Sequence, residues 1–413
     1  MPDTVIEEMF AEFEATARET FRPPGVPEAQ HRVRARRRRR RGLLAGVTAL
    51  LLAGSAGGYA AAHRGDRPEP TPTPTVSPTP DGKVTERKVA LPGVPGELTD
   101  LRFVDARTGW ALFDTCGSYD PDARGCQRTI ARTTDAGVTW RRTAFPAAPT
   151  GGVHLLPRDD ETLTVMARDG YLVTVDGGAT WTSHPLGSPP EATRRTFATP
   201  SGLFIGCPSP KGLDGGARGL TCGRQQVLRV VDGGALPHQP PVTLSQEVES
   251  VLFEGGDGRL WLTVLEGDRF TVITSDDLGV TWRKLPAVAG ARNLAASPDG
   301  RDVWLVRTDR PNAVWRLVRD RWQQGPGLPD DTDGVAAVGG GTLAVTSTYG
   351  GMGFVADGRY VDVPELRDLL HSSSNYGVGV AVLPDGTVLV TPANNMQLLG
   401  TGRGVDRTWV RVS

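Results

Sequence analysis

The chain has 413 residues, and its 46 Lys and Arg nearly balance its 47 Asp and Glu, so the formal net charge of −1 gives no reason to expect a nucleic-acid partner. The 52 glycines and 33 prolines are typical of many short strands joined by tight turns. Charge is unevenly placed, because residues 1–41 hold ten arginines against seven acidic residues.

Residues 1–41 are predicted to be a cytoplasmic tail that begins with a short amphipathic helix. Apolar side chains recur at helical spacing at Ile6, Met9, Phe10, Phe13 and Ala17. The segment 22–25, Arg-Pro-Pro-Gly, ends this helix. The helix is either a solvated part of the tail or a binding element for a cytosolic protein, and the sequence leaves both open.

Residues 42–62 carry no charge and are predicted to be a transmembrane signal anchor. They span about 30 Å as a helix, the thickness of a bilayer core. The arginines just before them, within residues 32–41, place the N-terminus inside, so residues 84–413 are expected outside the cell. A signal peptide cleaved near residues 60–62 is the alternative, but the 41-residue leader favours a retained, single-pass type II anchor.

Residues 63–83 form a Pro- and Thr-rich linker. Their alternating prolines, in the stretch DRPEPTPTPTVSPTPD at 66–81, favour an extended chain of about 50 Å. The linker is expected to hold the following domain away from the membrane.

One eight-residue pattern, Ser/Thr-x-Asp-x-Gly-x-Thr-Trp, recurs three times and resembles the Asp-box, or bacterial neuraminidase repeat. Its residues are Thr133, Asp135, Gly137, Thr139, Trp140, Thr174, Asp176, Gly178, Thr180, Trp181, Ser275, Asp277, Gly279, Thr281 and Trp282. A short Asp side chain accepts hydrogen bonds from nearby backbone N–H groups, and Gly permits conformations closed to other residues. We predict that each copy is a turn between antiparallel strands, that its Asp is structural, and that its Trp packs the hairpin against its own sheet.

Weaker versions of the pattern extend the repeat through residues 84–413. The seven units end 38 to 56 residues apart, at Trp140, Trp181, Pro237, Trp282, Trp322, Tyr360 and Trp409. Apolar strands are expected at the start of units, at 101–104, 248–253, 294–296 and 378–382. One unit has the length of a four-stranded blade, so we predict an all-β fold, a seven-bladed β-propeller built of short strands and many turns. Six or eight blades remain alternatives because four units are degenerate.

Ring closure is expected to use strands from both ends of this domain. Residues 88–92 and 408–412 compete for the same outer position in the last blade, and the sequence does not choose between them.

The four cysteines form two sequence-local pairs, and four cysteines permit three pairings. We expect disulfides between Cys116 and Cys126 and between Cys207 and Cys222, each stapling one hairpin outside the cytosol. Free thiols are the alternative. The spacings match no zinc site, and no catalytic, cofactor or metal-binding residue is assigned.

The boxes, together with the stretch 103–112, FVDARTGWAL, resemble the photosystem II assembly and stability factor propellers and their non-photosynthetic bacterial relatives. This resemblance implies a seven-bladed scaffold that binds proteins or peptides. The head of the chain resembles cytosolic heads of actinobacterial membrane proteins, some of them linked to sigma-factor regulation.

The same box occurs in sialidases, so an exo-glycosidase is the alternative function. Sialidases form six-bladed rings and carry an Arg-Ile-Pro motif near the start. This motif is missing from the present sequence. Acidic turns at 120–122 and 330–333 lack the order of a calcium loop. The loops at 349–353 and 372–376 are candidates for one rim of the ring, although plain connectors are favoured.

The sequence therefore predicts a non-enzymatic membrane protein whose extracellular propeller binds a protein, a peptide or a wall glycan. A purely structural surface protein with no saturable ligand is a third hypothesis.

Overall fold

A computed structural model of the chain describes residues 84–116, 125–146, 152–185, 189–208, 224–308, 312–371, 377–392 and 395–413. The chain divides into residues 1–46 and 47–413, and all described residues lie in the second unit. The predicted tail at 1–41, anchor at 42–62 and linker at 63–83 lie outside the described residues. Among the residues that are described, no helix is both long and apolar enough to cross a bilayer.

The described residues form seven β-sheets, which we number in chain order. The first contains β2 (Glu97–Phe103), β3 (Gly109–Asp114), β4 (Arg128–Thr133) and β5 (Arg141–Arg142); the second contains β6 (His154–Pro157), β7 (Leu163–Met166), β8 (Gly170–Thr174) and β9 (Thr182–Pro185). The third contains β10 (Leu203–Gly206) and β11 (Gln226–Arg229). The fourth contains β12 (Glu249–Glu254), β13 (Leu260–Glu266), β14 (Arg269–Ser275) and β15 (Arg283–Lys284).

The remaining sheets complete the series. The fifth contains β16 (Asn293–Ala296), β17 (Val303–Arg307), β18 (Ala313–Val318) and β19 (Arg321–Gly327); the sixth contains β20 (Thr332–Gly339), β21 (Thr342–Ser347), β22 (Met352–Ala356) and β23 (Arg359–Asp362). The seventh contains β24 (Gly379–Val382), β25 (Val388–Thr391), β26 (Gln397–Arg403), β27 (Asp406–Val412) and, from the other end of the domain, β1 (Thr85–Arg87). The prediction of an all-β, propeller-like arrangement is confirmed, and the four strands expected at unit starts overlap β2, β12, β16 and β24, with no more than one residue of each outside the observed strand.

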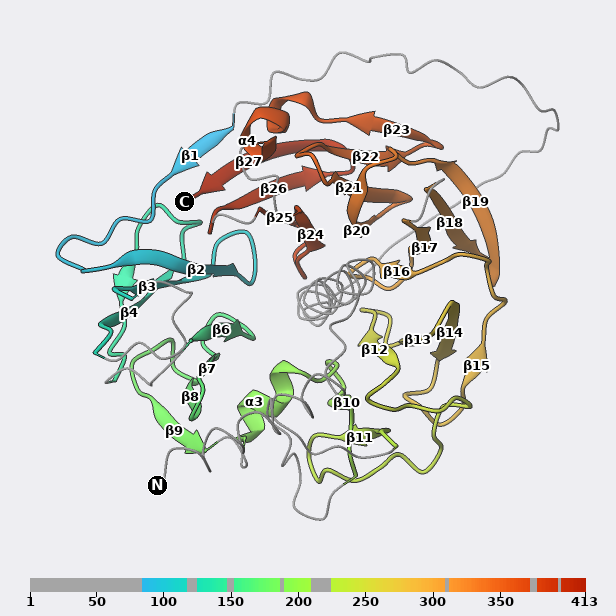
Figure 1. Cartoon of the computed structure of the whole chain (residues 1–413), viewed down its shortest axis with the longest axis horizontal. Helices are drawn as coiled ribbons and strands as arrows, with labels where there is room; N and C mark the ends of the chain where they lie inside the picture. The colour runs from blue at the N-terminus through green and yellow to red at the C-terminus, as the bar shows by residue number, and fades with distance from the viewer. Residues whose placement is uncertain are drawn as a thin grey trace, which may run out of the picture. The chain divides into compact units, whose positions relative to one another are not determined.

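The sheets follow one another around a ring, with β12, β16, β20 and β24 near its centre and β15, β19 and β23 on its outside (Figure 1). Apolar clusters join neighbouring sheets: one packs Trp110 and Ile130 of the first sheet against Leu163 and Val165 of the second. Similar clusters join the third sheet to the fourth, the fourth to the fifth, the fifth to the sixth and the sixth to the seventh.

Burial varies systematically across each sheet. The second strand of the first sheet, β3 with sequence GWALFD, is buried at every position, whereas its outer strand β5 is exposed. A strand with a sheet on each side has no solvent-facing side, so its sequence is a continuous apolar run rather than an alternating one.

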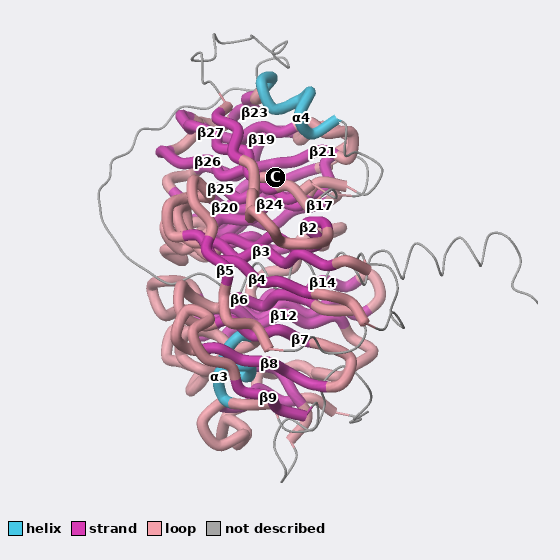
Figure 2. Tube along the Cα trace, turned by 90° about the vertical axis from the view of Figure 1, so that its left-hand side faces the viewer, coloured by secondary structure: helices cyan, strands magenta, loops and turns pink. Residues whose placement is uncertain are grey.

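Successive strands within each sheet are antiparallel, so the turns alternate between two ends of the sheet. Seen from the side, the strands run between the two faces of the ring and the turns lie on those faces (Figure 2). The turn between the first and second strands of a sheet lies on the same face of the ring as the turn between its third and fourth strands. The Asp-boxes are turns of the second kind, so we call this face the box face.

The third sheet departs from the expected four strands. Only β10 and β11 are described as strands, and single bridges join Gln225 to Leu244 and Leu228 to Ala235. A helix, α3 (Glu191–Thr196), precedes them and contacts β7 and β8 of the second sheet. A helix was not predicted here from the sequence; its buried Thr193 lies 3.3 Å from Thr164 of β7, hydroxyl to hydroxyl.

A second helical segment links the sixth and seventh sheets. It consists of η1 (Pro364–Leu366) and α4 (Arg367–His371), and it buries Leu366 and Leu370 against the cluster between those sheets. The proposed rim loop at 372–376 lies outside the described residues. In the other proposed rim loop, Tyr349 is exposed and residues 352–353 belong to β22.

Closure of the ring uses both ends of the domain, and the two end segments occupy different positions in the seventh sheet. β27 occupies the outer position of the seventh sheet, and β1 pairs with it in parallel as a fifth strand, with Thr85 opposite Val410. Strand β1 covers residues 85–87, and after it Val89 N donates to Ser413 O at 2.8 Å. The expectation that residues 88–92 would form the competing strand is wrong, because the chain pairs three residues earlier.

Candidate functional site

The first Asp-box turn is closed by hydrogen bonds that use both oxygens of one carboxylate. Thr133 Oγ1 and Thr139 N donate to Asp135 Oδ1 at 2.8 and 2.9 Å, and Thr139 Oγ1 donates to Asp135 Oδ2 at 2.6 Å. Gly137 N donates to Thr133 Oγ1 at 2.9 Å. All four donors belong to the box itself, so the carboxylate is engaged within its own turn.

The other two boxes repeat the same geometry. The equivalent bonds around Asp176 are 2.5 to 2.9 Å long, and those around Asp277 are 2.6 to 2.8 Å long. Donation from the Thr180 and Thr281 hydroxyls, then from the backbone, lowers the pKa of these two carboxyls to about 2. Burial raises the pKa of Asp135, but the hydrogen bonds from Thr139 and Thr133 outweigh it and bring the pKa to about 2.

The box glycines and tryptophans contact the preceding unit of the ring. Gly178, at φ +90°, lies where a Cβ would be 2.5 Å from Thr143 Cγ2, and Gly279, at φ +88°, where it would be 2.5 Å from Leu236 Cδ1. Trp282 Nε1 donates to His238 O at 3.0 Å. The prediction that each Trp packs the hairpin against its own sheet is thus too narrow, because the Trp282 indole also contacts the preceding unit.

A second set of turn aspartates on the box face was missed by sequence reasoning, apart from Asp105 in the 103–112 stretch. They accept backbone N–H groups two or three residues ahead, in the turn between the first and second strands. They are Asp105, Asp159, Asp257, Asp299 and Asp385. The signal was present as an Asp three or four residues before the second strand in these five sheets. Gly follows directly only after Asp257, Asp299 and Asp385, so the pattern is shorter and less regular than an Asp-box.

The Cys116–Cys126 disulfide is confirmed. Cys207 is also disulfide-bonded, and Cys222, its expected partner, lies outside the described residues. Asp114 lies close to the Cys116 and Cys126 sulfurs, but its carboxylate accepts from Arg128 Nε at 2.7 Å and from Cys116 N at 2.9 Å. Both sulfurs are consumed by the disulfide, so this group offers no thiolate ligands to a metal.

The acidic turns considered for calcium are engaged in the fold or lie outside its described part. Residues 120–122 lie outside the described residues. In the other turn, Asp331 O accepts from Thr348 N at 2.8 Å and Asp333 Oδ2 accepts from Val378 N at 3.2 Å. The second of these bonds links the sixth sheet to the start of the seventh.

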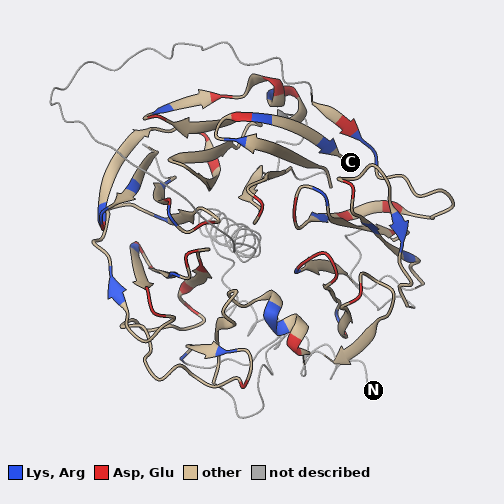
Figure 3. Cartoon of the chain, turned by 180° about the vertical axis from the view of Figure 1, so that it is seen from behind, with Lys and Arg blue, Asp and Glu red and all other residues tan. Residues whose placement is uncertain are grey.

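Charged residues of both signs are spread around the ring (Figure 3). Charged side chains also line two grooves. The larger, which we call the arginine groove, has a volume of about 460 Å³. It is lined by Arg132, Thr134, Thr139, Arg141, Arg142, Thr143, Ala144, Gly177, Gly178 and Ala179. It therefore lies between the first and second Asp-boxes, and its described lining has three cationic side chains and no acidic one.

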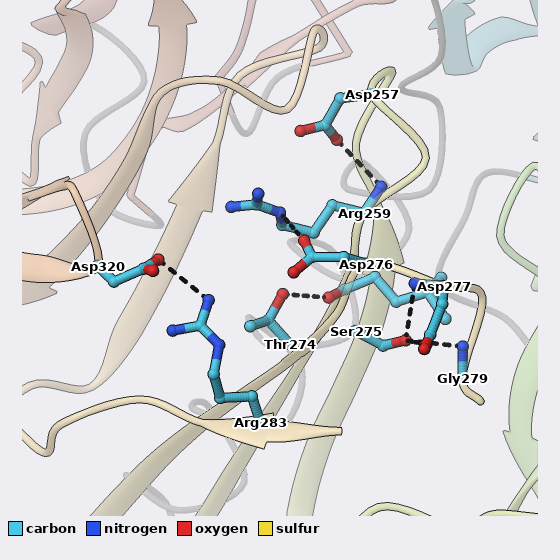
Figure 4. Close-up of polar contacts among 10 residues, drawn as sticks. Asp257, Arg259, Thr274, Ser275, Asp276, Asp277, Gly279, Arg283 and Asp320 are labelled. Carbon is cyan, nitrogen blue, oxygen red and sulfur yellow. Dashed lines mark hydrogen bonds and ion pairs between the residues drawn. The ribbon is translucent and has the colours of Figure 1, made fainter. Parts of the chain in front are cut away.

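The smaller groove, the mixed-charge groove, lies between the fourth and fifth sheets and has a volume of about 330 Å³. Its lining residues include Asp257, Arg259, Arg301, Arg319 and Asp320. Around it, Arg259 Nε lies 2.5 Å from Asp276 Oδ1, and Arg283 lies 3.0 Å from Asp320 Oδ1 (Figure 4). Opposite charges alternate here, so much of the charge is neutralised within the protein.

No protein-family model and no curated protein matches the chain. Among solved structures, YCF48 bound to D1 peptide is similar with a TM-score of 0.42 and 15% identity, covering 75% of this chain and 94% of that one. The β-propeller domain of Cps50 (Swd1) from Myceliophteria thermophila has a TM-score of 0.40 and 11% identity, covering 73% and 96%. An ancestral GH74 enzyme has a TM-score of 0.40 and 12% identity, covering 78% of this chain and 47% of that one, so this chain spans about half its length.

Proposed function

We propose that the chain is a membrane-anchored, extracytoplasmic binding module built on a seven-bladed β-propeller, and that it is not an enzyme. Its ligand would be a protein, a peptide or a wall glycan. One observation carries the proposal: the box carboxylates are engaged in closing turns, while the arginine groove beside them has no acidic side chain among its described lining residues.

The extracytoplasmic placement is supported by the confirmed disulfide, since disulfides persist in oxidising compartments. It is also supported by the arginine run followed by an uncharged stretch at 42–62. Protease treatment of intact cells tests it. Digestion of residues 84–413 is expected, and their protection until the membrane is opened would contradict the placement.

The alternative, an exo-glycosidase, needs a carboxyl group that donates a proton and a nucleophile at a set distance, which is a second carboxylate in most families and a tyrosine in sialidases. The lining of the mixed-charge groove includes two acids, Asp257 and Asp320. Asp320, and Asp276 beside the groove, each face a guanidinium. Both carboxylates are thus engaged in ion pairs with neighbouring arginines of the protein.

A hydrolysis screen separates the two functions. The purified full chain is incubated with sialosides and wall polysaccharides, and released sugar is measured beside equilibrium binding. We expect saturable binding without turnover. Turnover that is abolished by one carboxylate substitution, such as Asp276→Asn, would make the chain a hydrolase and overturn the proposal.

Residues 1–41 are proposed to recruit a cytosolic protein through their predicted helix. A pull-down with the full chain is compared with one in which Phe10 and Phe13 are replaced by Asp, which removes the apolar face. A specific partner is expected with the parent chain alone. Identical sets of proteins from both would contradict the recruitment.

A further inference from the structure

We propose that the arginine groove is a binding site for phosphate groups. This inference deepens the proposed binding function by naming a ligand chemistry, and it rests on that function. Four observations lead to it: the charge of the lining, a like-charged pair across two strands, the contrast with the fourth sheet, and the number of guanidinium groups.

The groove's cations are poorly neutralised within the described part of the chain. Arg141 and Arg142 are exposed and make no ion pair or side-chain hydrogen bond with any described residue. Arg132 has one acidic neighbour among the described residues, Asp160, at 3.9 Å, and the Asp160 side chain is 62% exposed. An ion pair that is long and open to solvent contributes little, so the groove keeps a positive potential.

Two of these arginines face each other across neighbouring strands. In the pairing of β4 with β5, Arg132 is directly opposite Arg141. Like charges at directly opposite positions destabilise a sheet. Arg132 is nevertheless held in place, because its guanidinium stacks on Trp110 at 5.6 Å from the ring centroid. A fixed pair of facing cations costs stability, and a bound anion would relieve that cost.

The fourth sheet provides a comparison inside the same chain. It carries the third Asp-box, and its residues at the positions of Arg132 and Arg141 are Thr274 and Arg283, which are paired in the same way. Arg283 is neutralised by Asp320, from the third-to-fourth strand turn of the next sheet. The corresponding turn beside Arg141 presents Gly177, Gly178 and Ala179 to the groove, so the described lining holds no counterpart of that carboxylate.

The number of cations indicates which anion fits. A carboxylate carries one negative charge and is satisfied by one guanidinium, which it meets with two parallel hydrogen bonds. A phosphate monoester carries about two negative charges and three acceptor oxygens, which suits several guanidinium groups that converge on one groove. A phosphate group could come from a soluble phosphate ester or from a phospholipid headgroup, and the experiment separates these sources.

The test is titration calorimetry on the full chain in maltoside micelles at low salt. The ligands are inorganic phosphate, glycerol 3-phosphate, the soluble headgroup glycerophosphoglycerol, and acetate as the singly charged control. We expect inorganic phosphate and glycerol 3-phosphate to bind and acetate not to bind. Glycerophosphoglycerol is a diester with one negative charge, so its comparable binding would show that the groove recognises the phosphate oxygens rather than a second charge, and would identify a phospholipid headgroup as a source. Binding of the monoester alone would identify a soluble ester.

Three variants locate the site. The double variant Arg141→Gln/Arg142→Gln is expected to bind at least about tenfold more weakly, because it loses two charge-assisted contacts. Ala179→Asp keeps every arginine but supplies the missing carboxylate, and it is expected to weaken binding by a similar factor. The matched control, Arg283→Gln/Lys284→Gln at the equivalent positions of the fourth sheet, is expected to bind like the parent chain.

The thermal midpoint of the ligand-free protein gives a second readout. If the arginines are structural, Arg141→Gln lowers it; if they are a binding site, it stays unchanged or rises as the repulsion is removed. The inference is overturned if no phosphate ligand binds, if acetate binds equally, or if the control loses binding to the same extent. Such a result would not contradict the proposed binding of other ligands, because that proposal is tested separately by the hydrolysis screen.

Discussion

The box aspartates are held in their charged form by hydroxyl and amide donors of their own turns. Asp135, Asp176 and Asp277 each accept from two neighbouring hydroxyl groups and from a backbone N–H. Their residue types and spacing were enough to predict this turn from sequence, because every donor lies within four residues of its acceptor. What the sequence could not show was the partner across the joint, since Thr143 and Leu236 belong to another unit.

Stability is expected to fall as the solution becomes more acidic than about pH 4. The pKa of each box carboxyl is about 2 in the folded protein, against an ordinary value of 3.8. Between these values the unfolded chain takes up protons that the folded chain does not, so the free energy of unfolding decreases as the pH falls from 3.8 towards 2. Urea unfolding across this range measures the slope. A triple Asp→Asn variant should show a flatter profile, and an unchanged profile would contradict the assignment.

Replacement of Gly178 by Ala is expected to destabilise the fold in two ways. At φ +90° the new side chain is strained, and its Cβ would meet Thr143 Cγ2 at 2.5 Å. The control is Gly258→Ala, which has φ +79° and no described atom within 4 Å of the new Cβ. The control should lose about 1 kcal/mol from strain alone, and Gly178→Ala a further 1 to 3 kcal/mol, roughly. Equal losses in chemical denaturation would show that the turn does not press on the preceding unit.

Strand β1 has only three residues, but its side chains contact both the first Asp-box and strand β27. Arg87 Nη1 donates to Ala136 O at 2.6 Å and to Asp135 O at 3.2 Å, so the strand ties the seventh sheet to the first Asp-box. Arg411 of β27 forms an ion pair with Glu86 at 3.0 Å. A three-residue strand has no periodicity to read, which is why sequence reasoning placed the closing segment a few residues too late.

Arg87→Ala is expected to loosen this closure. The variant removes a charged donor from two carbonyl groups, a loss of about 2 kcal/mol in the free energy of unfolding. Lys88→Ala is the matched control, because Lys88 is exposed and its side chain makes no hydrogen bond or ion pair among the described residues. Hydrogen exchange of β27 amides locates the effect. Exchange that accelerates equally in both variants would argue against a closing role for Arg87.

The ring as a whole was predictable from the sequence because its repeat is long, periodic and punctuated by boxes. The third sheet and helix α3 could not be predicted, because the unit ending at Pro237 lacks the Thr and Trp of the box. This unit keeps only the turn at Asp232, where hydrogen bonds from Gly234 N and Arg229 lower the pKa of the carboxyl. The arginine groove could not be predicted from the sequence either. Arg132 and Arg141 are nine positions apart, and only the pairing of β4 with β5 and the arrival of the next box reveal that they share a surface.

The parallel pairing of β1 with β27 determines how the ring would respond to mechanical load. In a parallel pair, the start of one strand and the end of the other lie at opposite ends, so tension between residues 84 and 413 slides the strands past each other. All ladder bonds then resist together instead of opening one by one. Optical-tweezers pulling from these two positions should give a single high-force rupture, whereas pulling from residues 84 and 406 should peel β1 away at lower force. Tension arriving through the predicted linker would thus meet the seam of the ring in its most resistant direction.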